Sequence, residues 1–242
     1  MAANVWGTPS KKPDVMKIKA LTLYCADLPG QTHFYTTTLG LSLVEQQEDS
    51  VVFDIGDSRL RLIRSAGFTP YHFAINIPAN KAKEAHRWLA GRLPILKDGP
   101  HEIQDFQKWN AQAIYFYDAD GNIVECIARR NLRNESQRPF DESALLNISE
   151  IGVPVTDIAQ TYKSLRSTVD LPIYDGSFER FCAMGDENGL FIGINKHIKD
   201  WFPTGDTAYS STFEIEFEEQ GISYSMDFKN GVLKGAGNTS MG

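Results

Sequence analysis

The sequence lacks any apolar run close to the ~20 residues that cross a bilayer as a helix. Residues 1–15 also lack the apolar segment of a signal peptide. With a net charge of −7, the chain has no excess of the basic residues that nucleic acids and anionic membranes attract. These absences predict a cytoplasmic protein that binds neither nucleic acid nor a membrane.

Cysteine is scarce as well. The chain has three, Cys25, Cys126 and Cys182, and each lies in a different predicted strand. An odd number spread out in this way favours neither a set of disulfides nor a metal–thiolate cluster. We interpret the three as reduced core residues of a cytosolic protein.

The clearest local pattern that is present is the segment AIYFYDADGNIVECIAR at 113–129. Aromatic and β-branched residues favour a strand up to Tyr117, and a second apolar run begins at Ile123. The residues between them supply turn chemistry, with Gly121 free to adopt a positive φ. Glu125 is the exception in the second run, because a carboxylate there is costly unless it faces water, a partner or a metal.

This pair of strands closes a unit that occurs more than once. Residues 17–63 predict a strand, a helix and three short strands. The order recurs with a strand at 71–77, a helix at 82–93 and the strands of 113–129. A long insertion at 97–112 precedes them and is interpreted as a functional lid or a disordered segment.

The sequence also contains a longer repeat, which spans more than one of these units. The pattern from Ile18 to Glu45 returns between Ile148 and Asp175, 130 positions later. A fourth copy begins at 211–217 but never completes a helix, and a hairpin is predicted at 222–233. Internal repeats of this kind predict an α+β fold of tandem βαβββ units in two similar halves.

The chain accordingly divides into five segments: a disordered lead-in (1–16), a first half of two βαβββ units (17–130), a linker (131–145), a second, incomplete half (146–220), and a hairpin with a loose tail (221–242).

Three motifs in these paired units resemble the vicinal oxygen chelate superfamily, which includes glyoxalases, bleomycin resistance proteins and extradiol dioxygenases. They are HFYTTTLGLSLVE at 33–45, YHFAINI at 71–77 and YFYDADGNIVECIAR at 115–129, and the resemblance covers nearly all of 17–217. It implies glyoxalase-like halves built from curved sheets, with a divalent metal in the concavity. In that family the metal binds neighbouring oxygens of the substrate and stabilises an enediolate, or activates dioxygen on a catecholate.

The resemblance puts His72 and Glu125 at ligand positions, as metal ligands and catalytic residues. An imidazole and a carboxylate suit Fe, Mn, Ni or Zn, but two protein ligands are an incomplete set. A non-haem iron dioxygenase requires two histidines and one carboxylate. Ala20, which matches His72 in the first unit, therefore counts against a dioxygenase.

The remaining ligand positions offer no second site. Leu60 matches Glu125 in the first unit and cannot bind a metal. Glu150, Thr212 and Gly193 match in the second half, and Glu150 is predicted to be a solvated residue at a strand edge.

Four aromatic residues are predicted to bind substrate: Tyr24, Tyr115, Tyr117 and Trp109. The alternative for the tyrosines is ordinary packing, since an error of one residue in strand phase reverses the face. Trp201 and Phe202 are predicted to be core, with a lid over the site as the alternative.

His72 and Glu125 have alternative interpretations too. His72 can be a half-buried histidine with its hydrogen bonds satisfied. Glu125 can pair with Arg59, Arg61 or Arg129. The two together can also form a metal-free acid–base pair.

Three hypotheses about function follow. The first is a metal-dependent enzyme, either a glyoxalase-like lyase or isomerase or an extradiol-type dioxygenase, acting on a small molecule with adjacent oxygens. The second is a metal-free binding or sequestering protein that resembles bleomycin resistance proteins. The third places all chemistry in 17–130, with the second half kept for packing. The expected partner is a small-molecule ligand, and the expected assembly is a monomer with pseudo-dimeric halves or a homodimer.

Overall fold

The structure is a computed structural model that describes residues 16–235. The predicted lead-in and loose tail lie outside the described residues, except for their inner ends. At the N-terminal side, Met16 is fully buried against Gly185 and Gly189, so the predicted disorder does not extend to this residue. No helix of the described chain is long and apolar enough to cross a membrane.

The first unit consists of β1 (Lys17–Cys25), α1 (Leu28–His33) with the π-helical turn η1 (Phe34–Thr38), β2 (Leu43–Gln46), β3 (Ser50–Ile55) and β4 (Ser58–Arg64). The second consists of β5 (His72–Ile77), α2 (Ala82–Ala90), β6 (Gln104–Phe106), the 3₁₀ turn η2 (Gln107–Trp109), β7 (Ala111–Tyr117) and β8 (Ile123–Arg129). The predicted insertion is therefore ordered as β6 and η2.

The second half begins after two 3₁₀ turns in the linker, η3 (Arg130–Leu132) and η4 (Glu142–Ala144). The third unit is β9 (Asn147–Val155), α3 (Ile158–Arg166), β10 (Ile173–Ser177), β11 (Phe181–Asp186) and β12 (Gly189–Asn195). The fourth has strands alone, β13 (Phe213–Glu219), β14 (Ile222–Lys229) and β15 (Val232–Gly235). The α+β fold of repeated units is confirmed, and β9 and α3 begin 130 positions after β1 and α1.

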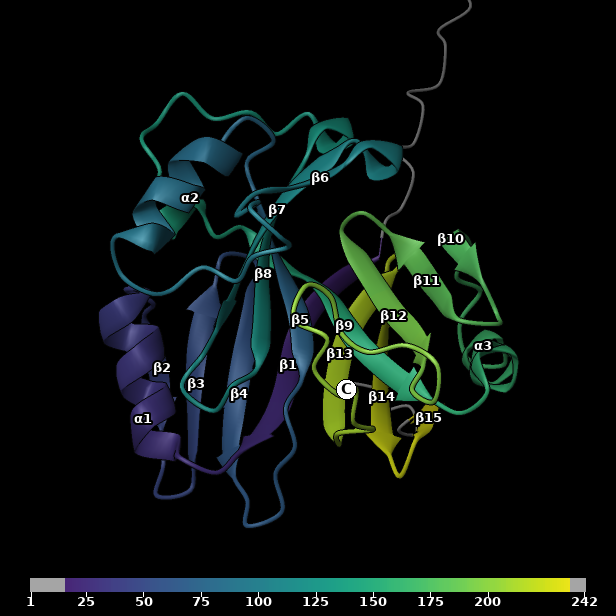
Figure 1. The fold of residues 1–242 in the computed structure, drawn as a ribbon. Helices are drawn as coiled ribbons and strands as arrows, with labels where there is room; N and C mark the ends of the chain where they lie inside the picture. The colour runs from purple at the N-terminus through teal and green to yellow at the C-terminus, as the bar shows by residue number, and fades with distance from the viewer. Residues whose placement is uncertain (1–15, 236–242) are drawn as a thin grey trace, which may run out of the picture.

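The strands form two sheets, and each sheet combines units from both halves of the sequence. The seven-stranded sheet has the order β15-β14-β13-β1-β4-β3-β2, and the eight-stranded sheet has the order β10-β11-β12-β9-β5-β8-β7-β6. Unit 1 thus joins unit 4 through the antiparallel pair β1–β13, and unit 2 joins unit 3 through β5–β9. Figure 1 shows this directly, because the purple β1 lies next to the yellow C-terminal strands.

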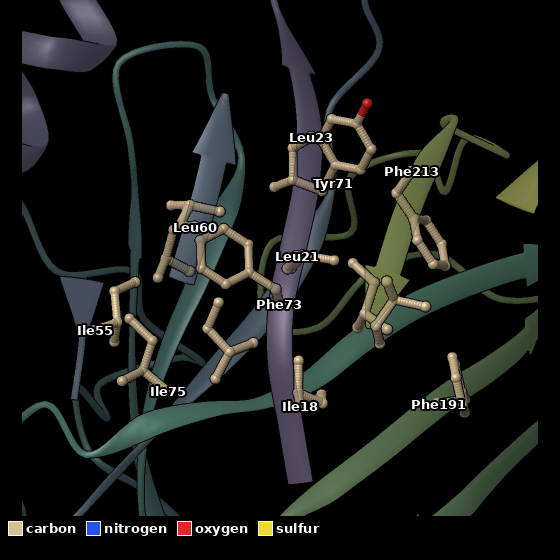
Figure 2. Packing of buried hydrophobic residues seen from close by; sticks show 14 of the residues in the cluster. Ile18, Leu21, Leu23, Ile55, Leu60, Tyr71, Phe73, Ile75, Phe191 and Phe213 are labelled. Atoms are coloured by element: carbon tan, nitrogen blue, oxygen red, sulfur yellow. The ribbon is translucent and has the colours of Figure 1, made fainter. Parts of the chain in front are cut away.

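The larger of two hydrophobic clusters in the described residues lies between the two sheets. It contains Leu21 of β1, Phe73 of β5 and Phe191 of β12, part of which Figure 2 shows. Along β5 the odd-numbered residues Phe73 and Ile75 enter this core. The even-numbered residues therefore face the opposite, concave side of the eight-stranded sheet. His72 is one of them.

A β-bulge in β9 directs a residue to the same concave side. Ala74 pairs with Glu150, whereas the next residue, Ile75, pairs with Ile148, so one extra residue sits in β9. Because of that extra residue, Ile148 and Ile151 both lie in the core while Glu150 faces the concave side.

Candidate metal centre in the eight-stranded sheet

Three neighbouring strands bring three ligand-type side chains together. Ala74 in β5 is paired with Glu125 of β8 on one side and with Glu150 of β9 on the other. His72 is two residues before Ala74, so its side chain emerges on the same face as both carboxylates. Sheet register alone thus explains why residues so far apart in sequence meet.

The ligand atoms of His72, Glu125 and Glu150 lie within 4.8 Å of one another, and these three form the single such group found in residues 16–235. Nε2 of His72 is 3.6 Å from Oε2 of Glu125. All three are buried, with exposed fractions of 6%, 3% and 3%. One imidazole and two carboxylates at this spacing match the donor set of a divalent transition-metal site with positions left open for substrate.

His72 is held in the form that a metal ligand needs. Its Nδ1 lies 3.2 Å from the carbonyl oxygen of Ile123, which makes Nδ1 the protonated nitrogen and leaves the Nε2 lone pair facing Glu125. Burial, with a smaller contribution from the charge of Lys199, lowers the pKa of His72 to about 4. The imidazole is therefore neutral near pH 7.

The pKa of Glu125 is shifted in the opposite direction from that of His72. Burial and the nearby charge of Glu150 raise its pKa well above the ordinary value, although Arg129 and a hydrogen bond with Tyr115 act in the other direction. Without a cation, Glu125 therefore keeps a proton in preference to a charge. A divalent ion placed between the two carboxylates would favour the ionised form of both.

Arg129 supplies a buried positive charge that contacts this cluster. Its side chain is fully buried, and it donates Nη2–H to Oε1 of Glu150 and Nε–H to Oδ1 of Asn76, the latter over 3.1 Å. Its guanidinium also lies 5.4 Å from the ring centre of Trp109. Arg129 balances the charge of Glu150, whereas Glu125 would need a cation in the site to lose its proton.

The three side chains line a cavity of about 540 Å³. Most of its wall is aromatic or aliphatic: Phe106, Trp109, Tyr115, Phe181, Ile192, Ile194, Trp201 and Phe202. The ring of Trp201 stands 4.9 Å from the ring of His72. A small ligand in this cavity would be largely shielded from water.

The predicted substrate-binding residues do not all meet here. Tyr115 and Trp109 line the cavity. Tyr117 does not line it, and its hydroxyl instead donates to Asp206. Tyr24 is in β1 of the other sheet, where its hydroxyl donates to Glu214 over 2.9 Å.

Glu150 was not predicted as a site residue, and the expectation of a solvated position at a strand edge is wrong. β9 is an internal strand between β12 and β5, and Glu150 is bonded to a buried arginine. Of the arginines considered for Glu125, Arg129 instead hydrogen bonds to Glu150, and Arg59 and Arg61 lie in β4 of the other sheet.

Trp201 and Phe202 fit both earlier interpretations. Trp201 is 6% exposed and packs in a small hydrophobic cluster, yet both side chains form part of the cavity wall. The sequence signal for the wall was the aromatic pair itself, placed just before the last unit. Nothing in the sequence showed which sheet it would cover.

Neither a protein-family model nor a curated protein sequence matches this chain. Solved structures do match it. A protein named "putative dioxygenase" from Bacillus subtilis subsp. subtilis str. 168 has a TM-score of 0.59 at 15% identity, over 93% of this chain and 85% of that one. A mutant of glyoxalase I from Zea mays has a TM-score of 0.51 at 14% identity, over 91% of this chain and 93% of that one.

Identities this low establish the fold and not the activity. The fold of this chain is glyoxalase-like, with two similar halves, as the sequence motifs predicted.

Proposed function

We propose that this protein is a metal-dependent enzyme, a lyase or isomerase of glyoxalase-like type, that acts on a small molecule with adjacent oxygen atoms. The observation that carries the proposal is the buried group of His72, Glu125 and Glu150 in the wall of a ligand-sized cavity. Structural ion pairs need no such cavity, whereas a catalytic metal site requires room for a substrate.

His72, Glu125 and Glu150 would hold the ion through Nε2 and one oxygen of each carboxylate. A divalent ion in this position supplies a Lewis acid, which binds neighbouring oxygens of a substrate and stabilises negative charge on them. The hydrogen bond between Nδ1 of His72 and the carbonyl of Ile123 keeps the imidazole oriented for this role.

The chain's own residues supply the rest of the environment. Tyr115 hydrogen bonds to Glu125 and so fixes the orientation of this carboxylate. Glu125, ionised when the ion is bound, would accept a proton from a carbon next to a carbonyl and return it. Trp201 and Phe202 exclude water from the space where this transfer would occur.

The composition of the ligand group favours a lyase or isomerase over an extradiol dioxygenase. Non-haem iron dioxygenases bind their metal through two histidines and one carboxylate. Here the group has one histidine and two carboxylates. Zinc, manganese or nickel suits that set at least as well as iron.

The second candidate function is metal-free binding of a small molecule, as in sequestering proteins. One observation favours it: Arg129 already pairs with Glu150, so part of the buried negative charge is balanced without a metal. The aromatic wall of the cavity suits either function.

Elemental analysis of protein purified without chelators separates the two. We expect close to one equivalent of metal in the wild type, and none in His72→Ala/Glu125→Ala or in Glu150→Gln. His101→Ala/Glu48→Ala, which changes the same residue types on the exposed surface, is the matched control and should keep the metal. Wild-type protein that takes up none of Fe, Mn, Ni and Zn on incubation would refute the enzyme proposal.

A further inference from the structure

Two lysines reach the wall of the cavity, and they differ in their partners. Lys108 is paired with Asp175 across the cavity rim, and its side chain is 80% exposed. For Lys199, by contrast, the structure shows no carboxylate within ion-pairing distance of Nζ anywhere in residues 16–235. Its one hydrogen bond is a long one, 3.5 Å, to the backbone carbonyl of Asp200.

Lys199 is half-buried in a wall that is mostly apolar. Its nearest described partner on that wall is the Phe181 ring, whose centre lies 6.0 Å from Nζ, at the long end of a cation–π contact. Burial and the charge of Arg180 lower the pKa of Lys199, although the charge of Asp200 acts in the other direction. Lys199 and the ligand group of His72, Glu125 and Glu150 line the same cavity.

We propose that Lys199 binds a carboxylate of the substrate, so that the cavity selects aromatic acids carrying vicinal oxygens at one end and a carboxylate at the other. The reference to vicinal oxygens rests on the proposed function. The substrate carboxylate is inferred from Lys199 alone. The ammonium of Lys199 has no ionic partner among the described residues, and a carboxylate of the substrate would supply one.

The shape and chemistry of the cavity support this class of ligand. A volume of about 540 Å³ holds a one-ring compound with substituents. Aromatic side chains such as Phe106, Trp109 and Phe202 line the cavity and can pack on a ring. Lys108 and Asp175 on this wall already pair with each other, so the ammonium of Lys199 and the ligand group are the features that would orient an asymmetric molecule.

The test uses two probes that differ in one charge, 3,4-dihydroxybenzoate and its neutral amide 3,4-dihydroxybenzamide. Quenching of tryptophan fluorescence gives the Kd of each for the full chain, since Trp109 and Trp201 line the cavity. We expect the wild type to bind the acid about tenfold more tightly than the amide, as a charge-assisted contact in a partly desolvated site allows.

Two variants test whether Lys199 causes the preference for the acid over the amide. Lys199→Met should bind acid and amide equally, and Lys108→Met, from the same wall, should retain the wild-type preference. The proposal is overturned if the wild type shows no preference, if Lys199→Met retains it, or if neither probe binds to the wild type.

Repeating the titrations with chelator present separates this proposal from the metal. If the chelator leaves the Kd of the amide unchanged, the metal-dependent function is refuted and the proposal for Lys199 is not. The preference for the acid in the chelated protein still decides the role of Lys199.

Discussion

Replacement of Arg129 should cause the largest loss in the free energy of unfolding. Its guanidinium is fully buried and bonded to Glu150 and Asn76. Arg129→Met leaves the Glu150 carboxylate buried without a partner, which costs about 3–5 kcal/mol. Urea unfolding of the metal-free variants measures this loss.

The double variant Arg129→Met/Glu150→Gln is the control for that prediction. It removes both charges, so it should recover much of the stability lost by Arg129→Met alone. Equal losses in Arg129→Met and in the double variant would contradict the prediction, because removing the unpaired charge of Glu150 would then restore no stability.

His72 should make the metal-free protein sensitive to acid. Its pKa is lowered from 6.5 to about 4 by burial. Between these pH values His72 binds a proton in the unfolded chain but not in the folded chain. The contribution to the free energy of unfolding is therefore fully present above pH 6.5 and is lost as the pH falls toward 4. The shift corresponds to about 3 kcal/mol.

The measurement is urea unfolding with chelator at pH 7 and pH 4.5. His72→Gln should lose less stability over this interval than the wild type. His101→Gln, which changes an exposed histidine outside the cluster, should behave as the wild type does. Parallel losses in all three proteins would contradict the assignment to His72.

At the scale of elements, the β3–β4 turn depends on a glycine for two reasons. Gly56 has a φ of 54°, and a Cβ there would lie 1.9 Å from the carbonyl oxygen of Leu146. The adjacent Asp57 donates its N–H to that same oxygen. Gly121 has a similar φ of 77°, but a Cβ would meet nothing within 4 Å.

This pair of glycines separates backbone strain from collision. Gly121→Ala should cost about 1–2 kcal/mol for the left-handed conformation. Gly56→Ala should cost clearly more, because the backbone at Leu145 and Leu146 must also move away from the turn. Equal losses in the free energy of unfolding for the two variants would mean that this backbone moves without cost.

The elements themselves were largely predictable from the sequence. Gly231 follows Asn230 with both residues at positive φ, and the predicted hairpin forms around them as β14 and β15. The 130-residue repeat predicted the third unit, because the two copies share the same spacing of apolar residues even where the residues themselves differ. The bulge in β9 was not predictable, since strict alternation places Glu150 on the same face as Ile148.

The site was predictable in part for the same reason. His72 and Glu125 lie on regular strands, so motif and alternation were enough to select them. Glu150 and Lys199 depend on which unit pairs with which, and that is decided by packing between distant strands. Tyr24 was selected on local pattern alone, and the structure places it in the other sheet.

At the scale of the molecule, the cross-paired sheets predict that neither half of the sequence folds alone. β1 and β5 each lose a sheet neighbour when residues 139–242 are removed, because β13 and β9 belong to the second half. A fragment of residues 1–138 should therefore form no folded monomer, and co-expression with 139–242 should restore a one-to-one complex.

Light scattering after gel filtration, with elemental analysis, gives the test. The reconstituted complex should bind metal as the intact chain does, because Glu150 comes from the second fragment. A monomeric 1–138 fragment that folds and binds metal would instead support the hypothesis that all chemistry lies in 17–130.

The pairing of β1 with β13 also sets an order of events during synthesis. Tyr24 and Glu214 are hydrogen-bonded across 190 positions, so β1 leaves the ribosome long before its partner exists. The eight-stranded sheet can close once β12 has been made, whereas the seven-stranded sheet must wait for the last strands. Through most of translation the first strand keeps an open edge, which makes the nascent chain a natural client for chaperones.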